Sequence, residues 1–435
     1  MKKNNTELKQ KKVIKFVKNY FSKNNSPFLK ENYFALYENG EGYKKIKEKV
    51  FNTKQIKNIK YYISNIANLI SIFKYDILAY KKKNFFYKNL IITWGDNSSF
   101  LKNGSFDDRY FSLNSDTYEN TFWIVLSNKK FKNFSFRSNI AIITPKKKIL
   151  NIFYFFQYIV NFFFSREKNF VDQSRLIADC INGYISNNVN LSKLKNLIMP
   201  YEGQAFQKLI FSKQKKLNKK LKTYGFDHSA PHSLPTQMYY TVGSPDKLLV
   251  TGSNTQKCYS NFYNWPKKKI TITFPSRYKN FSKKHFSNNL FLPYDFDVDD
   301  TIVESLDFYL NTIPNNSLNK INIKIHPVKL LDKKHILLKQ KLDYVIRKYD
   351  KKFYFKSRKS FTIVVGFTTT AIVALEFKMT VLHICPNPNL DPYLNYFWHD
   401  IDIVKINDYC FLYKLKKSYK YLNFKCDDKL KAILK

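Results

Sequence analysis

Two stretches in the last third of the chain decide the fold: INIKIHP at 321–327 and FTIVVGFTTTAIVALEF at 361–377. Each begins with a short run rich in β-branched residues, and such runs predict buried strands. The first run stops at His326-Pro327, and the second passes into a helix pattern whose first turn is crowded with threonines. An imidazole and a helix N-terminus are thereby placed at strand ends. Open α/β sheets bind ligands at that edge and helix N-termini bind phosphate, so these stretches predict a site for a nucleotide-containing ligand.

Strand and helix patterns alternate around these stretches. Strand patterns occur at 246–252, 268–278, 288–295, 320–327, 352–357, 362–366 and 380–386, with helix patterns between them at 255–265, 299–310, 333–349 and from Thr370. This alternation predicts βα units and a doubly wound parallel sheet. The first half shows strand patterns at 89–95, 120–127 and 138–145, after Lys-rich sequence that predicts helices up to about residue 85, including 61–83.

At 435 residues, the chain is long enough for two domains that each bury a core. We predict an α/β fold of two Rossmann-like domains that face each other across a cleft. The first domain is 1–242, which has a helical start, and the second is 243–400, which carries the nucleotide-binding edge. The tail 401–435 is expected to pack back on the first domain.

The chain is strongly basic, since 75 Lys and Arg residues against 33 Asp and Glu residues give a net charge of +42. Such an excess is typical of proteins that contact anionic lipid headgroups, nucleic acid or phosphorylated substrates. The joint enrichment of Lys, Asn, Phe, Tyr and Ile offers another explanation, which is AT-rich codon usage. Lys also outnumbers Arg, the side chain that favours bidentate recognition of bases and phosphates, so no specific nucleic acid partner is expected.

Cysteine usage and hydropathy indicate a cytoplasmic protein. Five scattered cysteines without a C-x-x-C pair predict neither a disulfide framework nor a zinc site. We find no signal-peptide pattern and no apolar run of about 20 residues. The apolar stretch 149–164 is flanked by Lys146–Lys148, Arg166 and Lys168, and it predicts either a buried helix or a helix that contacts an anionic membrane. The second of these alternatives would place the protein peripherally at the inner face of the cell membrane.

The ends of the predicted strands carry a resemblance to a known family. Two α/β domains, with strands of the second that end in G-S, S-R, H-P and G-F-T-T-T, resemble a GT-B glycosyltransferase. Segments such as MPYEGQAFQKLI (199–210) are similar to bacterial surface-carbohydrate transferases, including those that use CMP-activated sialic acid or Kdo. Their shared elements match Glu202-Gly203, His326-Pro327 and Thr368–Thr370. The usual acidic motif has two acidic residues before Gly, whereas this chain has Tyr201-Glu202, which leaves the base and the sugar open.

The resemblance and the chemistry of sugar transfer assign catalytic roles. Transfer from a nucleotide donor needs a base for the acceptor hydroxyl and groups that stabilise the departing phosphate. Glu202 is the candidate base and Asp108 the reserve; the alternative for Glu202 is a charge that interacts with a helix dipole. His326 would bind and protonate the phosphate; the alternative is a capped strand end before Pro327.

The same edge supplies candidate donor ligands. Thr368, Thr369 and Thr370 would present hydroxyl and N–H groups to the phosphate, or serve as a plain N-cap. The resemblance implies that Glu376 holds the ribose hydroxyls. The remaining donor candidates lie at strand ends, where Arg277 would pair with a phosphate or carboxylate or be a simple surface residue: Gly252, Ser253, Ser276 and Arg277.

Two loops of the first domain are candidates for acceptor binding. His228 and His232 lie four residues apart in a Pro-containing loop without a third ligand nearby, so no metal is expected there. Asp107 and Arg109 flank Asp108 in a polar stretch that is also typical of a solvated turn.

We therefore predict an inverting, metal-independent glycosyltransferase without a resident cofactor. Its donor would be a nucleotide sugar, CMP-linked by the resemblance alone, and its acceptor a surface glycan or lipid-linked molecule such as a lipopolysaccharide or capsule precursor. A polyol-phosphate transferase of the CDP-glycerol type is the alternative enzyme. A non-catalytic basic protein that binds membrane or nucleic acid is the alternative from another class. No P-loop motif indicates an NTPase.

Overall fold

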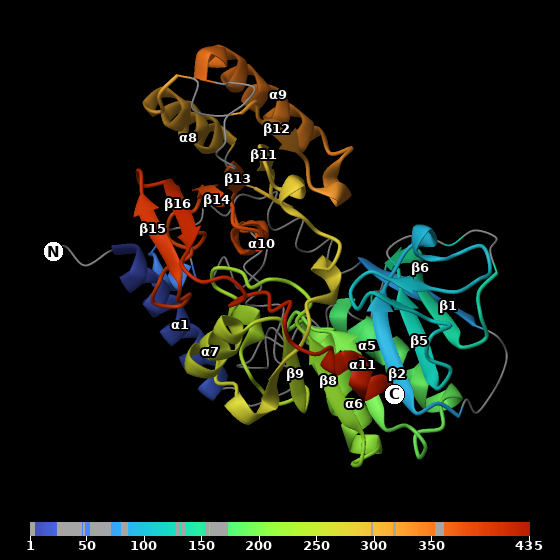
Figure 1. Ribbon diagram of the computed structural model, residues 1–435. Helices are drawn as coiled ribbons and strands as arrows, with labels where there is room; N and C mark the ends of the chain where they lie inside the picture. The colour runs from blue at the N-terminus through green and yellow to red at the C-terminus, as the bar shows by residue number, and fades with distance from the viewer. Residues whose placement is uncertain are drawn as a thin grey trace.

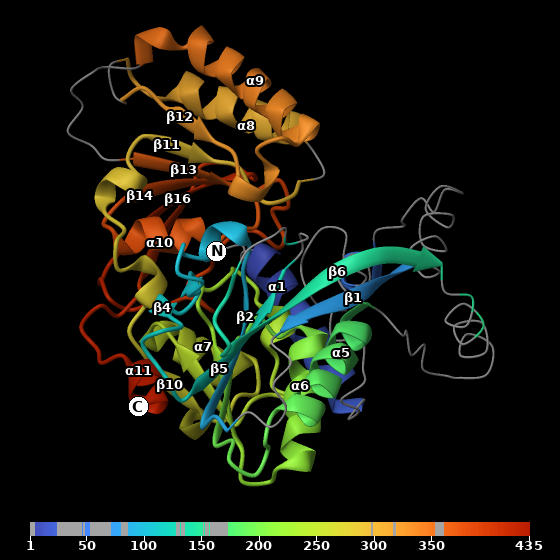
Figure 2. The ribbon, with the colours of Figure 1, turned by 90° about the vertical axis from the view of Figure 1, so that its right-hand side faces the viewer.

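The structure is a computed structural model that describes residues 5–23, 46, 48–52, 71–79, 86–127, 131, 135–150, 152, 156, 173–296, 299–315, 319–352 and 361–435. The chain forms two α/β halves, each built on one main sheet, and the short helix α10 (Thr370–Glu376) lies between the two sheets (Figures 1 and 2). A separate two-stranded sheet pairs β3 (Asp107–Asp108) with β4 (Leu113–Asn114).

The first half is built on eight strands in the order β1-β6-β5-β2-β7-β8-β9-β10. β1 and β6 are antiparallel, and all other neighbours are parallel. The strand order reverses between β2 and β7, which makes their carboxyl ends the topological switch point. The strands are β1 (Ser71–Ala79), β2 (Asn89–Trp94), β5 (Thr121–Leu126), β6 (Ile140–Leu150), β7 (Asn196–Pro200), β8 (Lys222–Phe226), β9 (Lys247–Val250) and β10 (Ile270–Ile272).

Both faces of the first sheet are covered, as its continuous apolar strands require. In β2, Leu90 and Ile92 belong to one buried cluster and Ile91 belongs to another, because successive side chains point to opposite faces. The first cluster includes side chains of α1 (Asn5–Lys23), α5 (Gln173–Asn188), α6 (Ala205–Leu217) and α7 (Ser253–Phe262). The second includes Leu430 and Leu434 of the C-terminal helix α11 (Lys429–Leu434).

The second half is built on six strands in the order β12-β11-β13-β14-β16-β15. The first four are parallel, and β16 and β15 add an antiparallel edge. The strand order reverses between β11 and β13, which gives this sheet its own switch point. Helices α8 (Asp299–Thr312) and α9 (Lys333–Lys348) lie outermost in Figure 1. The strands are β11 (Asn289–Phe291), β12 (Asn322–Lys324), β13 (Phe361–Val365), β14 (Thr380–Ile384), β15 (Ile401–Lys405) and β16 (Cys410–Leu415).

The predicted fold class is confirmed: both halves are α/β and both are Rossmann-like, with strand orders that reverse as in nucleotide-binding sheets. One buried cluster is continuous across them, since Val250 and Met238 of the first half share it with Val364, Ala371 and Tyr393 of the second. The two halves are therefore packed together through apolar side chains rather than joined by a linker alone.

Three predictions about chain organisation differ from the strand pairing. β9 and β10 continue the first sheet, so the change of sheet falls between Ile272 and Asn289, although we assigned 243–400 to the second domain. The predicted helix over 61–83 is wrong where β1 forms, because nine residues there pair with β6 and this pairing overrides local propensity. In the predicted tail, β15 and β16 extend the second sheet before α11 reaches the first core.

Two further predictions lie mostly outside the described residues. The predicted helix 149–164 overlaps the end of β6 at residues 149 and 150, and beyond it only residues 152 and 156, both helical, are described. The strand predicted at 352–357 is described only at its first residue. Within the described part of the chain, no helix is long and apolar enough to cross a membrane.

Candidate functional site

Glu202 lies directly after β7, at the switch point of the first sheet. The turn that positions it depends on Gly203, whose φ is +69° and whose added Cβ would lie 2.1 Å from the carbonyl oxygen of Gln237. The Glu202 side chain is 37% exposed, and its Oε2 accepts a hydrogen bond of 2.7 Å from Gln204 Nε2. Burial raises the pKa of Glu202, although the positive charge of Arg277 opposes the shift. A partly accessible carboxylate with a raised pKa suits a general base.

His228 follows β8 and brings a second titratable group to the same edge. Its Nε2 lies 3.6 Å from Glu202 Oε1, and the ring of Tyr110 packs edge-on against the imidazole at 4.6 Å. Burial, and then the charge of Arg277, lower the pKa of His228 well below its usual value. The imidazole is therefore neutral at pH 7. It can hydrogen-bond within the site without cancelling the negative charge of Glu202.

Arg277 is the cation of this site. It lies in the short 3₁₀ helix η5 (Ser276–Tyr278) after β10, and its guanidinium carbon is 5.8 Å from the centre of the Tyr110 ring. Its charge lowers the pKa values of Glu202 and His228 in the first half and of His326 in the second. Arg277 therefore acts electrostatically on both halves, which is what a phosphate bound between them would need.

Asp227 belongs to the site but is missing from our sequence predictions. It is buried beside His228, and its Oδ2 accepts a hydrogen bond of 2.7 Å from the Tyr259 hydroxyl. Burial raises its pKa to about 7, and the negative charge of Glu202 adds to the shift. The available signal was its position, since Asp227 is the first residue after β8. Its coupling to Glu202 and Tyr259 could not be read from the sequence.

Asp108 has a structural role in the loop that carries Tyr110. Its Oδ1 accepts hydrogen bonds from the backbone N–H groups of Tyr110 at 2.8 Å and Phe111 at 2.5 Å, and its Oδ2 accepts one from Thr93. The side chain is buried, and burial raises its pKa to about 7. This geometry makes Asp108 a poor reserve base, because its oxygens are engaged within the protein.

The pKa of Asp108 predicts a pH-dependent contribution to stability. Because the folded-state pKa of about 7 lies above the ordinary value of 3.8, this contribution is complete below pH 3.8 and is lost as pH rises through 7. Asp108→Asn keeps an acceptor oxygen and cannot ionise. The wild type should lose unfolding free energy between pH 5 and pH 8 as Asp108 ionises. The Asp108→Asn variant should lose about 2 kcal/mol less over the same range. Urea denaturation at both pH values measures this, with Asp107→Asn as the exposed control; equal pH dependence in all three proteins would contradict it.

The other predicted acceptor residues of this loop lie at its surface. Asp107 is exposed, and Arg109 is exposed with its Nη2 3.7 Å from Asp96 Oδ1 at the end of β2. Exposed ion pairs of this kind contribute little to stability. The Arg109 Nη2 also donates a hydrogen bond to Ser98 Oγ, and the side chain remains exposed, so its charge is accessible to a ligand.

His326 brings a group from the second half. It caps the short 3₁₀ helix η7 (Pro327–Lys329), where its Nδ1 accepts a 3.4 Å hydrogen bond from the Val328 N–H, and Pro327 is the first residue of that helix. The ring of Tyr294 packs edge-on against the imidazole at 5.3 Å. Burial, followed by the charges of His335, Arg277 and Lys329, lowers its pKa. The half-buried ring is thereby neutral at pH 7, and because Nδ1 accepts, its proton is on Nε2, which can donate to a ligand.

The threonines after β13 lie where the two halves meet. Thr368 Oγ1 accepts from the Thr370 N–H at 3.2 Å and donates to Thr370 Oγ1 at 3.1 Å, and Thr369 is the N-cap of α10. The Tyr393 hydroxyl lies 2.8 Å from the carbonyl oxygen of Thr368 and 2.9 Å from that of Pro231. The segments after β13 and after β8 are therefore joined through one phenol.

His232 is part of that junction. Its ring stacks on Phe367 with a centroid distance of 4.3 Å and an interplanar angle of 4°. Burial lowers its pKa to about 4, so it is neutral at pH 7. The structure thus places His232 between the halves as a packing residue, whereas His228 lies beside Glu202.

Three predicted donor ligands, Gly252, Ser276 and Glu376, contact the C-terminal segment of the chain. A Cβ on Gly252 would lie 2.4 Å from the Lys420 carbonyl oxygen, which also accepts a hydrogen bond from the Asn254 N–H in the first turn of α7. Ser276 Oγ lies 3.3 Å from Asp428 Oδ2. Glu376 is buried and accepts hydrogen bonds from four consecutive backbone N–H groups, those of residues 419–422. The predicted ribose role of Glu376 stays a prediction, and it would require these backbone N–H groups to give up the carboxylate.

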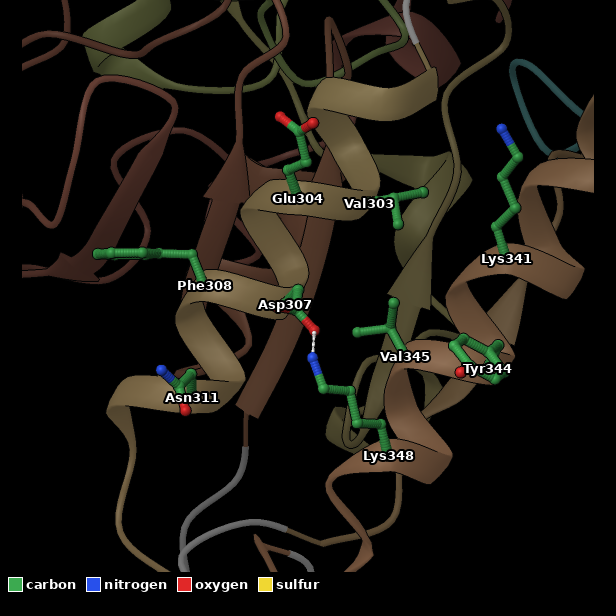
Figure 3. A pocket seen from close by; sticks show the side chains of 9 residues that line it. All are labelled: Val303, Glu304, Asp307, Phe308, Asn311, Lys341, Tyr344, Val345 and Lys348. Carbon is green, nitrogen blue, oxygen red and sulfur yellow. Dashed lines mark hydrogen bonds and ion pairs between the residues drawn. The ribbon is translucent and has the colours of Figure 1, made fainter.

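A surface pocket of about 620 Å³ lies away from these residues, between α8 and α9 (Figure 3). The Asp307–Lys348 ion pair of 2.9 Å crosses it, and Phe308 and Tyr344 are the aromatic residues of its lining. None of the predicted site residues lines it. Within the described residues, no cluster of three His, Cys, Asp or Glu side chains could hold a metal ion.

Comparisons with known proteins give little further guidance. No protein family model matches the chain, and no curated protein matches it. Among solved structures, the chain is similar to the crystal structure of a glycosyltransferase from Rickettsia africae ESF-5, with a TM-score of 0.31 and 11% sequence identity over 72% of this chain and 86% of that one. A likeness this distant carries no argument about mechanism, so the function is argued from the site itself.

Proposed function

We propose that the chain is a glycosyltransferase that moves a sugar from a nucleotide donor to an acceptor hydroxyl. The observation that carries the proposal is that functional groups come together from the carboxyl edges of both sheets, with Glu202 and Thr368 following the switch-point strands β7 and β13. Glu202, His228 and Arg277 come from the first half, and His326 and Thr368 come from the second. Switch points are where open α/β sheets bind nucleotides, and two of them joined edge to edge can hold a donor and an acceptor together.

The chemistry of these groups matches the two demands of sugar transfer. Glu202 would accept the proton of the attacking hydroxyl, and its raised pKa brings the carboxylate nearer to the working pH of a base. Arg277, His326 and the threonine hydroxyls of Thr368–Thr370 would bind the phosphate that leaves with the nucleotide. A fixed cation and fixed donors cost no reorganisation as negative charge develops on that phosphate.

The finer assignment rests on the resemblance of the strand-end motifs. We propose a CMP-linked nonulosonate donor, such as an activated sialic acid or Kdo, with inversion at the anomeric carbon. The acceptor would be a surface glycan or a lipid-linked precursor at the inner face of the cell membrane, which fits the net charge of +42. Asp107, Arg109 and His228 remain the proposed acceptor contacts.

Nucleotide binding tests this proposal directly. We expect CMP to raise the thermal midpoint of the purified protein selectively among CMP, CDP, UDP, GDP and ADP, because binding to the folded state alone stabilises it. His326→Ala should lose at least half of that shift, whereas His399→Ala, which removes an exposed imidazole elsewhere, should keep it. A preference for CDP would favour polyol-phosphate transfer. No response to any nucleotide in folded protein would contradict the transferase function.

A further inference from the structure

The segment that follows His326 exposes apolar side chains that the folded core does not use. Leu331 is 93% exposed and Leu330 is 58% exposed, and Val328 and Leu337 are also exposed. We call these four residues the apolar tip. They lie in η7, in the turn after it and on the outer face of α9. Soluble proteins rarely cluster exposed aliphatic side chains in this way unless the surface binds something.

The core side of α9 is satisfied without these residues. Leu338, Leu342, Val345 and Ile346 point inward and belong to the buried cluster of the second half. The outer face of the same helix instead presents Leu337 and Tyr344. Since the helix is already packed through its inner face, exposure of the outer aliphatic residues is not a packing requirement of the fold.

Basic side chains surround the apolar tip. Residues 327–342 contain five lysines and one acidic residue, Asp332. Asp332 is engaged locally, because its Oδ2 lies 2.6 Å from His335 Nδ1 and also accepts from the His335 N–H as the N-cap of α9. Its charge is therefore directed into the helix start. Three of the lysines have partners: Lys334 donates to the Phe296 carbonyl oxygen, Lys339 pairs with Asp343 at 2.7 Å, and Lys341 pairs with Asp299 at 2.6 Å. Lys329 and Lys333 flank Leu330 and Leu331 and place positive charge beside them.

We propose that the apolar tip and its lysines form a docking surface for an anionic lipid bilayer. Aliphatic side chains at a protruding turn can enter the headgroup region, while long lysine side chains keep their ammonium groups at the phosphates. An anionic bilayer supplies both the apolar depth and the negative charge that complement this surface. An acidic protein partner would supply the charge, but Leu331 at 93% exposure projects into solvent and does not line a groove that a protein segment could fill.

The position of the surface gives it a functional meaning. The apolar tip begins two residues after His326, at the carboxyl edge of the second sheet, and α9 lies on the outside of the molecule in Figure 1. A bilayer bound there would lie beside the rim of the candidate site, so a lipid-linked molecule could reach the site without leaving the membrane. Docking itself does not depend on the transfer reaction, so either can fail while the other holds.

Co-sedimentation of the full-length protein with vesicles tests the proposal. We expect binding to vesicles of phosphatidylglycerol and phosphatidylcholine, with much weaker binding to phosphatidylcholine alone. Leu330→Ser combined with Leu331→Ser should lower the partition coefficient by about tenfold or more. The matched control combines Leu101→Ser with Leu217→Ser, two leucines of about 49% and 48% exposure elsewhere on the surface, and it should bind like the wild type.

A second readout locates the contact. Brominated phosphatidylglycerol should quench the tryptophan fluorescence of Leu331→Trp more than that of the wild type, which has four native tryptophans. Quenching of Leu217→Trp should not increase. Equal partitioning of the wild type and the Leu330/Leu331 double variant would overturn the proposal. So would a change in self-association of that variant, measured by sedimentation velocity, with vesicle binding unchanged, because the surface would then bind protein. CMP stabilisation measured on the same samples reports separately on the donor site.

Discussion

Replacement of Glu202 by glutamine is expected to slow sugar transfer by about 10²- to 10⁴-fold, the usual contribution of a general base. The rate is measured as the formation of free nucleotide from the sugar donor. Glutamine keeps the size of the side chain and an acceptor for Gln204 Nε2, so the turn held by Gly203 should persist. The donor is the sugar conjugate of whichever nucleotide stabilises the protein. The thermal midpoint and its shift with that nucleotide should stay close to wild type, which separates a lost base from a lost fold.

The pH profile adds a readout that a structural role would not change. Because burial raises the pKa of Glu202, kcat/KM of the wild type should fall on the acidic side with an apparent pKa above that of an ordinary glutamate. The Glu202→Gln variant should lose that acidic limb. Glu119→Gln, which changes an exposed carboxylate before β5, is the control and should behave like the wild type. Normal turnover in Glu202→Gln would move the base to another carboxylate, and Asp227 would be the next to test.

Local sequence patterns predicted many of the strands, though not β1, β15 or β16, and most of the edge residues. Runs such as FTIVV form β13 as predicted, because β-branched residues suit a strand that is buried on both faces. Glu202, His326 and Thr368 lie at strand ends as predicted, because the neighbouring Gly, Pro and hydroxyl residues end strands. The helix predicted over 61–83 failed at β1, where nine residues pair with β6 about 70 positions later in the chain.

Long-range contacts account for the rest of what the sequence did not predict. Gly252 was interpreted as a ligand-binding glycine, but the atoms that exclude a Cβ there belong to Lys420 and Tyr421. The pairing of Asp227 with Tyr259 and the influence of Arg277 on both halves likewise depend on how separate βα units pack. Spacing along the chain carries no information on such contacts, so the residue types were predicted better than their partners.

Replacement of Glu376 by alanine is expected to lower the free energy of unfolding by about 4 kcal/mol. The carboxylate accepts from the N–H groups of four consecutive residues, at 2.6 Å from Tyr419, 2.9 Å from Lys420, 2.6 Å from Tyr421 and 3.2 Å from Leu422. Tyr421 and Leu422 are buried, so alanine leaves their N–H groups without an acceptor, at a cost of about 1–3 kcal/mol for each donor that finds no water. Urea denaturation measures the loss, and Glu304→Ala on the exposed face of α8 is the control.

The same variant distinguishes a structural carboxylate from the ribose contact that the family resemblance implied. Loss of the four hydrogen bonds to Glu376 should free the segment that follows β16. Limited proteolysis should therefore cut Glu376→Ala between β16 and α11 faster than the wild type. Glu376→Gln should fall between the two, because an amide oxygen accepts hydrogen bonds without the charge that strengthens them. A ribose contact predicts the opposite pattern, with unchanged stability and weaker nucleotide binding. That pattern would require the C-terminal segment to leave Glu376 when the donor binds, and the four N–H groups would then need other partners.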